Sequence, residues 1–229
     1  IIAYASLTVF GISSSIYGVS DSVEPVPDFE VMSMNRAGID DSVANEDGVV
    51  RLSDLQGSVV VLDFMAVDCA NCHYVQGHID ENLDSWQTSG GLHPVVVISI
   101  GSWYGYESFD RINSTFGDVD SDRHMRWPVV NGASDSVILE GGERGDLVEH
   151  YFAQNLPLVL IIDHDGFVVA KEGTGTPLDG WESFDRALDL AMDGEAESLR
   201  FGIDKADRSA IGVFFVGLFL GVLVFFSPC

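Results

Sequence analysis

The stretch from Val59 to His73, which reads VVVLDFMAVDCANCH, constrains the fold of this chain more than any other. An apolar, mostly β-branched run predicts a buried strand, and a short loop follows it. Cys69 and Cys72 come next, three residues apart, where the first turn of a helix is expected. At that spacing the two side chains lie on one face, close enough to form a disulfide. A strand, a turn and a Cys-X-X-Cys pair at a helix start therefore predict a thiol-based redox site.

The two cysteines are expected to differ in reactivity. Cys69 comes first, at the helix N-terminus, where unpaired backbone amides stabilise a thiolate, the nucleophile of disulfide exchange. Asp68 directly precedes Cys69, and a carboxylate there opposes thiolate formation. At roughly 7 Å and an effective dielectric of ~40, the penalty is about 1 kcal/mol, or on the order of 20 mV toward a more reducing couple. Asp68 is therefore predicted to tune the potential, and the site to act as a reductant.

Strand and helix patterns alternate around this centre and predict an α/β sandwich. The expected strands are residues 58–65, 94–100, 157–162 and 167–170, with a hairpin at 45–52. Helices are expected at 75–86, 109–116, 147–153 and 181–191, the last capped by Asp179. Residues 24–29 are interpreted as an extended linker, and the Asp- and Gly-rich stretch 117–145 as an insert or substrate-facing loop.

Both ends of the chain are apolar, because every charged residue falls between Asp21 and Arg208. Residues 1–20 are interpreted as the remainder of a signal peptide or an N-terminal anchor. Sixteen apolar or glycine residues from Ile211 to Phe226 lead into Ser-Pro-Cys and predict the start of a truncated transmembrane domain over 210–229. The expected organisation is thus a leader at 1–20, a redox domain at 21–198, a juxtamembrane linker at 199–209 and this membrane segment.

The charge balance narrows the possible partners. A formal net charge of −25 excludes nucleic acid as a natural partner, because phosphates would be repelled. The same charge suits a domain held in solution outside the membrane, where disulfides form. Only two of the 11 basic residues are lysines, which is compatible with a salt-adapted protein and equally with an ordinary acidic secreted domain.

Six short motifs occur in a fixed order along residues 25–195: Val26-Pro27-Asp28-Phe29, Leu52-Ser53-Asp54-Leu55 with Gly57, Asp63-Phe64, Cys69-Ala70-Asn71-Cys72, Leu156-Pro157, and Ile162-Asp163 with Gly166. Each is weak alone, but the ordered set resembles the thioredoxin-like superfamily and looks closest to its membrane-tethered TlpA/ResA branch. The resemblance implies a central mixed sheet flanked by helices. It also implies a thiol:disulfide oxidoreductase that reduces protein disulfides, apocytochrome c cysteines among them, with no cofactor beyond the Cys69–Cys72 disulfide.

The resemblance also implies roles for two further residues. Asp63 matches the buried carboxylate that family members use to take and return the Cys72 proton. Pro157 resembles the family's cis-proline, which faces the disulfide and offers backbone groups to an extended client; the isomer itself cannot be read from the sequence. Met65, Asp68 and Asn71 depart from the usual family residues, so the client specificity and potential of relatives are not carried over.

The C-terminal Phe-Phe-Ser-Pro-Cys is similar to the first membrane helix of CcdA/DsbD electron carriers. In those proteins a Pro-Cys pair begins a transmembrane thiol relay. The resemblance therefore implies a redox relay role for Cys229, with a membrane thiol carrier domain as the partner of the redox domain.

Two alternatives use the same residues. Cys69-Ala70-Asn71-Cys72-His73 also reads as CxxCH, the attachment motif for a c-type haem, although haem sites usually lie in a largely helical fold. The cysteines with His73 and His78 could also be drawn as a metal-ligand set, or the module could be redox-silent. Helical spacing places the two histidines on different faces, which favours ordinary surface histidines, and no metal is expected.

Overall fold

β3 (Val59–Met65) is the central strand of the domain, and each of its seven residues is buried. The computed structural model describes residues 23–33 and 43–203, of which Pro25–Arg200 belong to one compact unit. β3 pairs in parallel with β4 (Val95–Gly101) on one side and antiparallel with β8 (Leu158–Ile162) on the other. A strand covered on both faces needs apolar residues throughout, which explains its near-continuous valine and leucine run.

The sheet extends outward from these three strands. β5 (Val129–Asn131) adds in parallel to β4, and β9 (Val168–Glu172) pairs antiparallel with β8. β1 (Asp28–Ser33) joins antiparallel to β5. The described residues thus form a nine-stranded mixed sheet in the order β7-β6-β1-β5-β4-β3-β8-β9, with β2 (Val49–Arg51) paired to β1 and with β6 (Val137–Ile138) and β7 (Arg144–Gly145) forming an outer hairpin.

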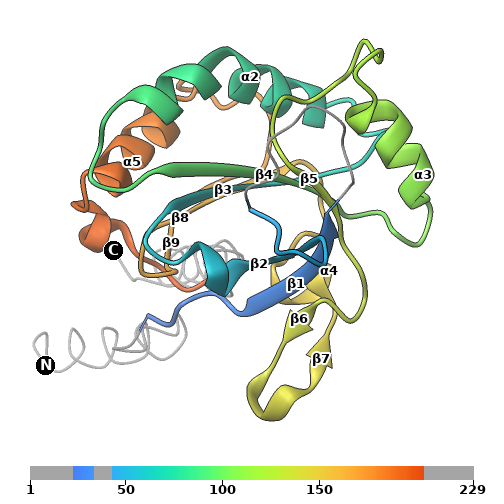
Figure 1. The fold of residues 1–229 in the computed structure, drawn as a ribbon. Helices are drawn as coiled ribbons and strands as arrows, with labels where there is room; N and C mark the ends of the chain where they lie inside the picture. Colours follow the sequence, from blue (N-terminus) through green and yellow to red (C-terminus); the bar gives the residue numbers. More distant parts are fainter. Residues whose placement is uncertain (1–22, 34–42, 204–229) are drawn as a thin grey trace, which may run out of the picture. The chain divides into compact units, whose positions relative to one another are not determined.

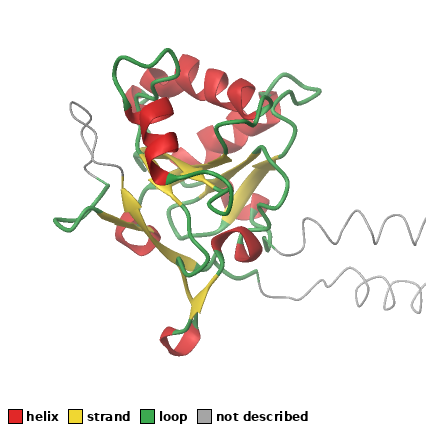
Figure 2. Ribbon diagram, turned by 90° about the vertical axis from the view of Figure 1, so that its right-hand side faces the viewer, coloured by secondary structure: helices red, strands yellow, loops and turns green. Residues whose placement is uncertain are grey.

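Helices α2 (Cys72–Thr88) and α5 (Glu182–Met192) cover one face of the sheet (Figures 1 and 2). The buried positions of α2 recur at spacings of three and four and pack on β3 and β4. This packing anchors the long helix that follows the cysteines. The main core cluster joins the two helices to the sheet through these buried residues: Val59, Val61, Met65, Val75, Ile79, Leu83, Trp86, Phe184, Leu188 and Ala191.

The opposite face of the sheet is covered by the single turn α4 (Leu147–His150) and the residues after it. Tyr151 is fully buried there, with its ring centroid 5.8 Å from that of Phe29 and 5.5 Å from that of Phe64. The remaining short helices are α3 (Phe109–Ile112), a π-turn at Asn113–Gly117 and 3-10 turns at Leu52–Leu55, Glu140–Gly142 and Ala196–Leu199.

Most of the expected strands and helices are present, but three expectations differ from the structure. The stretch 117–145 is not an insert, because it supplies β5 within the main sheet and the β6–β7 hairpin. The linker expected at 24–29 already contains the start of β1. The hairpin expected at 45–52 has its turn and its returning strand, β2, but β2 pairs with β1 rather than with the residues just before the turn.

The expected α/β domain is therefore confirmed. Several other expectations concern residues outside the described ranges. These are the anchor at 1–20, the membrane segment at 210–229 with Cys229, and the linker at 199–209 from residue 204 onward. Among residues 23–33 and 43–203, no helix combines the length and apolar character needed to cross a bilayer.

Candidate active site

The cysteines lie in the connection between β3 and α2. α2 begins at Cys72, so Cys69 lies one turn ahead of the helix rather than within its first turn as expected. The turn is held by the Cys72 N–H, which donates to the Cys69 carbonyl oxygen at 3.1 Å. The two residues are joined by a disulfide, with their Cα atoms 5.3 Å apart. The Cys72 N–H also points at the Cys69 sulfur at 3.2 Å, so the first amide of α2 faces the sulfur of Cys69.

The two sulfurs differ in burial. Both belong to the core cluster, but Cys72 has 0% of its surface exposed, whereas Cys69 retains 7%. A client can therefore reach the first cysteine more readily than the second. This asymmetry suits Cys69 as the attacking thiol and Cys72 as the thiol that resolves a mixed disulfide.

Asp63 is a buried carboxyl on β3. Alternation along the strand places it on the same face as Val61 and Met65, which belong to the core cluster that also contains Cys72. Ser99 Oγ of β4 donates to Asp63 Oδ2 at 2.7 Å, while Asp63 Oδ1 has no hydrogen-bond partner among the described residues. Burial raises the pKa of Asp63 to about 7, against the lowering effect of the Ser99 hydrogen bond. The carboxyl can thus gain or lose a proton near neutral pH.

Pro157 lies directly before β8, and the Leu156–Pro157 peptide bond is cis. The loop after β9 brings it near the cysteine loop. A Cβ atom on Gly175 would lie 2.5 Å from the Asn71 carbonyl oxygen and 3.4 Å from Pro157 Cγ, so this glycine packs against both residues. Asn71 stands between the two cysteines in sequence, and Pro157 therefore borders the disulfide loop.

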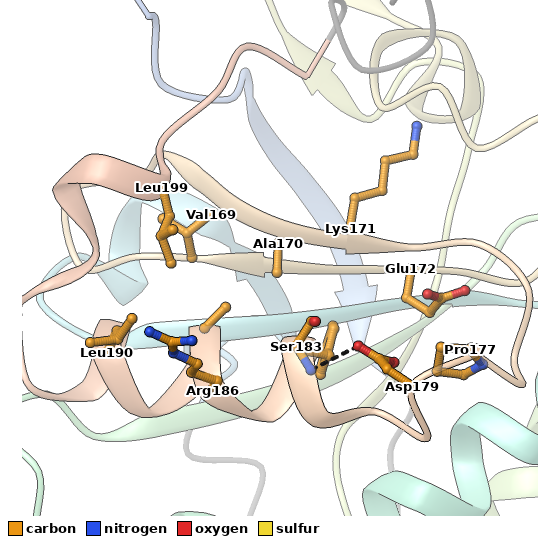
Figure 3. A pocket seen from close by; sticks show the side chains of 12 residues that line it. Val169, Ala170, Lys171, Glu172, Pro177, Asp179, Ser183, Arg186, Leu190 and Leu199 are labelled. Atoms are coloured by element: carbon orange, nitrogen blue, oxygen red, sulfur yellow. Dashed lines mark hydrogen bonds between the residues drawn. The ribbon is translucent and has the colours of Figure 1, made fainter. Parts of the chain in front are cut away.

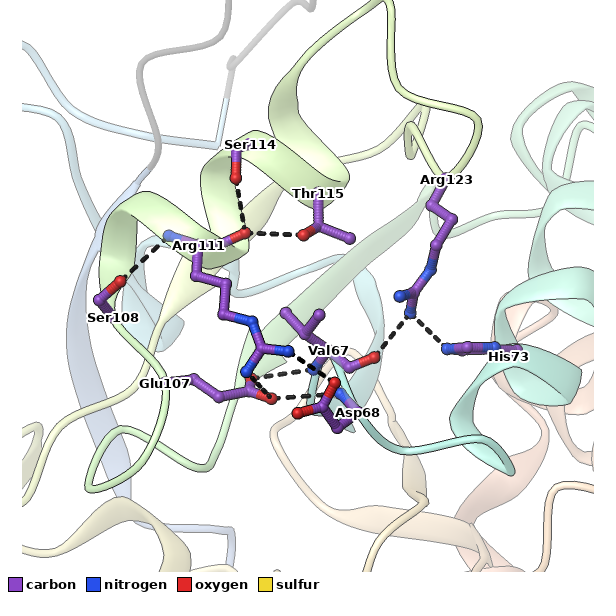
Figure 4. A network of polar contacts seen from close by, with 9 residues as sticks. All are labelled: Val67, Asp68, His73, Glu107, Ser108, Arg111, Ser114, Thr115 and Arg123. Atoms are coloured by element: carbon purple, nitrogen blue, oxygen red, sulfur yellow. Dashed lines mark hydrogen bonds and ion pairs between the residues drawn. The ribbon is translucent and has the colours of Figure 1, made fainter.

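Asp68 has a counter-charge that the sequence did not indicate. Its side chain is exposed, and Arg111 Nη2 donates to Asp68 Oδ1 at 2.6 Å (Figure 4). Arg111 lies in α3, 43 residues further along the chain. The carboxylate next to Cys69 is therefore ion-paired rather than isolated, and its opposition to a Cys69 thiolate is weakened.

Glu107 is a site residue that the sequence analysis missed. Only 4% of its surface is exposed, and its carboxylate accepts two hydrogen bonds from the cysteine loop. The Val67 N–H donates at 2.9 Å and the Asp68 N–H at 3.2 Å, while Arg111 Nη1 lies 4.0 Å away (Figure 4). No local pattern marks it, because its partners lie 40 and 39 residues earlier.

Arg123 approaches the same loop from the opposite side (Figure 4). It donates to the Val67 carbonyl oxygen at 3.0 Å, contacts His73 Nε2, and lies over the Phe116 ring at 4.7 Å. Burial, and then the nearby Arg123 charge, lower the pKa of His73. A neutral His73 can accept the Arg123 N–H, so the contact fixes one side of the cysteine loop.

The histidines do not assemble with the cysteines. His78 Nε2 bonds instead to Asp185 at 2.8 Å, and its ring stacks on Trp181 with the centroids 4.3 Å apart. Within the part of the chain that the structure describes, no group of three or more potential metal-ligating side chains comes together.

Two surface pockets differ in their relation to the cysteines. A pocket of about 400 Å³ borders the cysteine loop and is lined by Asp68, Trp103, Tyr106, Glu107 and Arg111. Trp103 and Tyr106 are both exposed, Tyr106 to 90%. A second pocket of about 470 Å³ lies between β9 and α5, and no residue of the cysteine site lines it (Figure 3). The first pocket is therefore the one placed to meet a client bound at Cys69.

Neither a protein-family model nor a curated protein sequence matches this chain. Many solved structures resemble it, and three of them are described below. An uncharacterized conserved protein from Geobacillus kaustophilus has a TM-score of 0.51 at 21% identity, covering 76% of this chain and 83% of its own. A candidate protein disulfide isomerase from Bacteroides thetaiotaomicron has a TM-score of 0.50 at 17% identity, covering 75% and 90%.

The third structure, a thioredoxin-like superfamily protein, has a TM-score of 0.50 at 14% identity, covering 73% of this chain and 96% of its own. At these identities the similarity establishes the architecture. The chain has a thioredoxin-like α/β fold, with its Cys69–Cys72 disulfide at the start of α2.

Proposed function

We propose that this protein is an extracytoplasmic thiol:disulfide oxidoreductase that reduces protein disulfides. The observation that carries the proposal is the pair of adjacent sulfurs, with the less buried one facing the first amide of α2. A sulfur in that position is stabilised as a thiolate, and a neighbouring thiol three residues later can complete the exchange.

The first step begins from the dithiol form. The Cys69 thiolate attacks one sulfur of a client disulfide, forming a Cys69–client mixed disulfide and expelling the other client sulfur as a thiolate. That thiolate takes a proton from solvent. The Cys72 N–H that faces the Cys69 sulfur favours the attacking anion over the neutral thiol.

The second step releases the client. Cys72 loses its proton and attacks the Cys69 sulfur, which forms the Cys69–Cys72 disulfide and expels the second client sulfur as a thiolate that takes a proton from solvent. Two electrons have then passed to the client, and two client thiols have formed. Asp63 is the proposed acceptor of the Cys72 proton, supported by its burial on the same sheet face and its pKa of about 7.

Client recognition is proposed to use the surroundings of the disulfide. Pro157 borders the cysteine loop and offers its backbone to an extended client segment. The pocket with Trp103 and Tyr106 adjoins Asp68, the residue directly before Cys69.

The source of electrons is proposed to be a membrane thiol carrier of the CcdA/DsbD kind, reached through Cys229. The sequence supports this with the apolar run Ile211–Phe226 and the Ser-Pro-Cys that follows it. In this arrangement the redox domain stays tethered outside the membrane, as in the TlpA/ResA branch, and apocytochrome c cysteines are candidate clients.

A trapping experiment tests the exchange mechanism. The variant Cys72→Ser, with Cys69 reduced, should form a stable mixed disulfide with insulin or another protein that contains disulfides. This product is seen as a DTT-sensitive band of higher mass. Cys69→Ser should form no such band, since it lacks the attacking thiol. Wild-type protein should reduce insulin with DTT as electron donor. A wild-type protein that fails to reduce insulin, or that shows haem absorbance in the Soret region, would overturn the proposal.

A further inference from the structure

Apart from Asp63, Glu107 is the buried carboxylate of the cysteine site: its side chain is 1% exposed, whereas that of Asp68 is 61% exposed. A buried carboxylate is unfavourable unless hydrogen bonds compensate for the lost water. Here the compensation comes from the cysteine loop, since the Val67 and Asp68 N–H groups both donate to Glu107. Glu107 and this loop therefore hold each other in place.

The direction of these hydrogen bonds affects Cys69. An N–H that donates to Glu107 points toward that carboxylate, so the two amides immediately before Cys69 are not available to stabilise its thiolate. Glu107 also adds a negative charge in a site with little water, where charges interact more strongly than at an exposed position. Both effects oppose the Cys69 thiolate.

Arg111 acts in the opposite sense. Its guanidinium lies between the two carboxylates, 2.6 Å from Asp68 Oδ1 and 4.0 Å from Glu107 Oε1 (Figure 4). The positive charge of Arg111 partly cancels the effect of both carboxylates on the Cys69 thiolate. The acidity of Cys69 therefore depends on the balance between Glu107 and Arg111.

We infer that Glu107 is a positioning residue that turns the loop amides away from Cys69 and, opposed by Arg111, sets the acidity and redox potential of the Cys69–Cys72 pair. This inference rests on the proposed function for its biological meaning. It is supported by the hydrogen bonds, burial and ion pairs alone, and it concerns a property of the free protein that no client is needed to measure.

The inference predicts opposite signs for two variants. Glu107→Gln keeps the side-chain shape but removes the charge. It also replaces one of the two accepting oxygens by an NH2 group, so one of the two loop N–H donors faces a donor instead of an acceptor. The Cys69 pKa should fall and the thiolate fraction at pH 6 should rise about three- to tenfold. Arg111→Gln should raise the Cys69 pKa and lower that fraction. The redox equilibrium with glutathione should shift toward the dithiol form in the first variant and toward the disulfide in the second.

The experiment follows iodoacetamide alkylation of the reduced full-length chain between pH 4 and 9, together with its equilibrium in glutathione buffers. Asp110→Asn is the matched control, because Asp110 is an exposed carboxylate in the same segment whose side chain forms no hydrogen bond or ion pair with the described residues of the cysteine loop. It should leave both readouts unchanged. Far-UV circular dichroism and thermal melting establish that each variant is folded.

A purely structural role would lower the melting temperature of Glu107→Gln without moving the alkylation profile or the glutathione equilibrium, and that result would overturn the inference. If Glu107→Gln does not fold, Arg111→Gln tests the inference instead. An unchanged Cys69 pKa in that variant would contradict the proposed opposition between Glu107 and Arg111. A wild-type protein that cannot reduce insulin, combined with the expected opposite shifts, would reject the proposed function and leave this inference standing.

Discussion

Burial of Asp63 should couple the stability of the oxidised domain to pH. Its folded-state pKa of about 7 lies above the ordinary value of 3.8, so between those values the folded protein holds a proton that the unfolded chain releases. The Asp63 contribution is therefore most favourable below about pH 4 and declines toward pH 7, by about 1.4 kcal/mol per pH unit at most.

Asp63→Asn removes this contribution. In urea unfolding of the oxidised protein from pH 4 to 8, the free energy of unfolding of the variant relative to wild type should rise with pH, by a few kcal/mol in total. Parallel stability curves would contradict the raised pKa. The same variant should slow insulin reduction, with the alkylation rate of Cys69 as the control for an intact nucleophile.

Asp68→Asn should lower the Cys69 pKa less than Glu107→Gln does. Asp68 is exposed and already paired with Arg111, and charges at such positions are screened by salt. Alkylation profiles at 0.1 and 1 M NaCl test this, since the Asp68 effect should shrink at high salt while the Glu107 effect persists. A larger shift for Asp68→Asn would reverse the ranking of the two carboxylates.

At the residue scale, local chemistry could be predicted and partners distant in the sequence could not. The spacing of Cys69 and Cys72 and the position of Asp63 within an apolar strand are visible in a single segment. Glu107 could not be recognised, because its hydrogen bonds reach Val67 across 40 residues. Arg111 was missed for the same reason, which left Asp68 interpreted as an unpaired charge.

At the element scale, α2 depends on its buried face. Ile79 is 1% exposed and belongs to the core cluster between α2 and the sheet. Ile79→Ala should lower the free energy of unfolding by about 3 kcal/mol through lost burial and the cavity it leaves. Glu81→Ala, at an exposed position of the same helix, should leave it nearly unchanged. Chemical denaturation checks both, and equal effects would mean that the helix is not anchored by this face.

The segment between β4 and α3 should contribute to client binding. Tyr106 is 90% exposed in the pocket beside Asp68. Tyr106→Ala should therefore raise the KM for a protein client severalfold, without changing reduction of a small disulfide such as oxidised glutathione. Tyr74→Ala, an exposed aromatic outside this pocket, is the control. Equal loss on both substrates would place Tyr106 in the exchange chemistry or in folding instead.

Helices and strands could be predicted from the sequence where a segment was long enough for its pattern of apolar residues to be recognised. The spacing of Val75, Ile79 and Leu83 identifies α2, and the valine run identifies β3. β5 spans only Val129–Asn131, which is too short for a periodic signal, and its identity as a strand comes from pairing with β4. The surrounding Asp and Gly residues made the whole stretch resemble a loop.

At the scale of the whole molecule, the charge balance should make stability depend on salt. A net charge of −25 gives self-repulsion in the folded state, which ions screen. The thermal midpoint should therefore rise between 0.1 and 1 M salt, and NaCl and KCl should act alike because the effect is electrostatic. A midpoint that stays constant or falls would show that the acidic side chains are already compensated.

The hydrogen bonds around Ser99 have a directional consequence. Trp127 Nε1 donates to one lone pair of Ser99 Oγ at 2.8 Å, while the Ser99 hydroxyl donates its hydrogen to Asp63 Oδ2 at 2.7 Å. With Oδ2 already accepting from Ser99, a proton taken up by Asp63 in this arrangement belongs on Oδ1, the oxygen without a partner among the described residues. The indole thus helps to orient the Ser99 hydroxyl toward Oδ2, which leaves Oδ1 as the oxygen through which the carboxyl takes up and releases its proton.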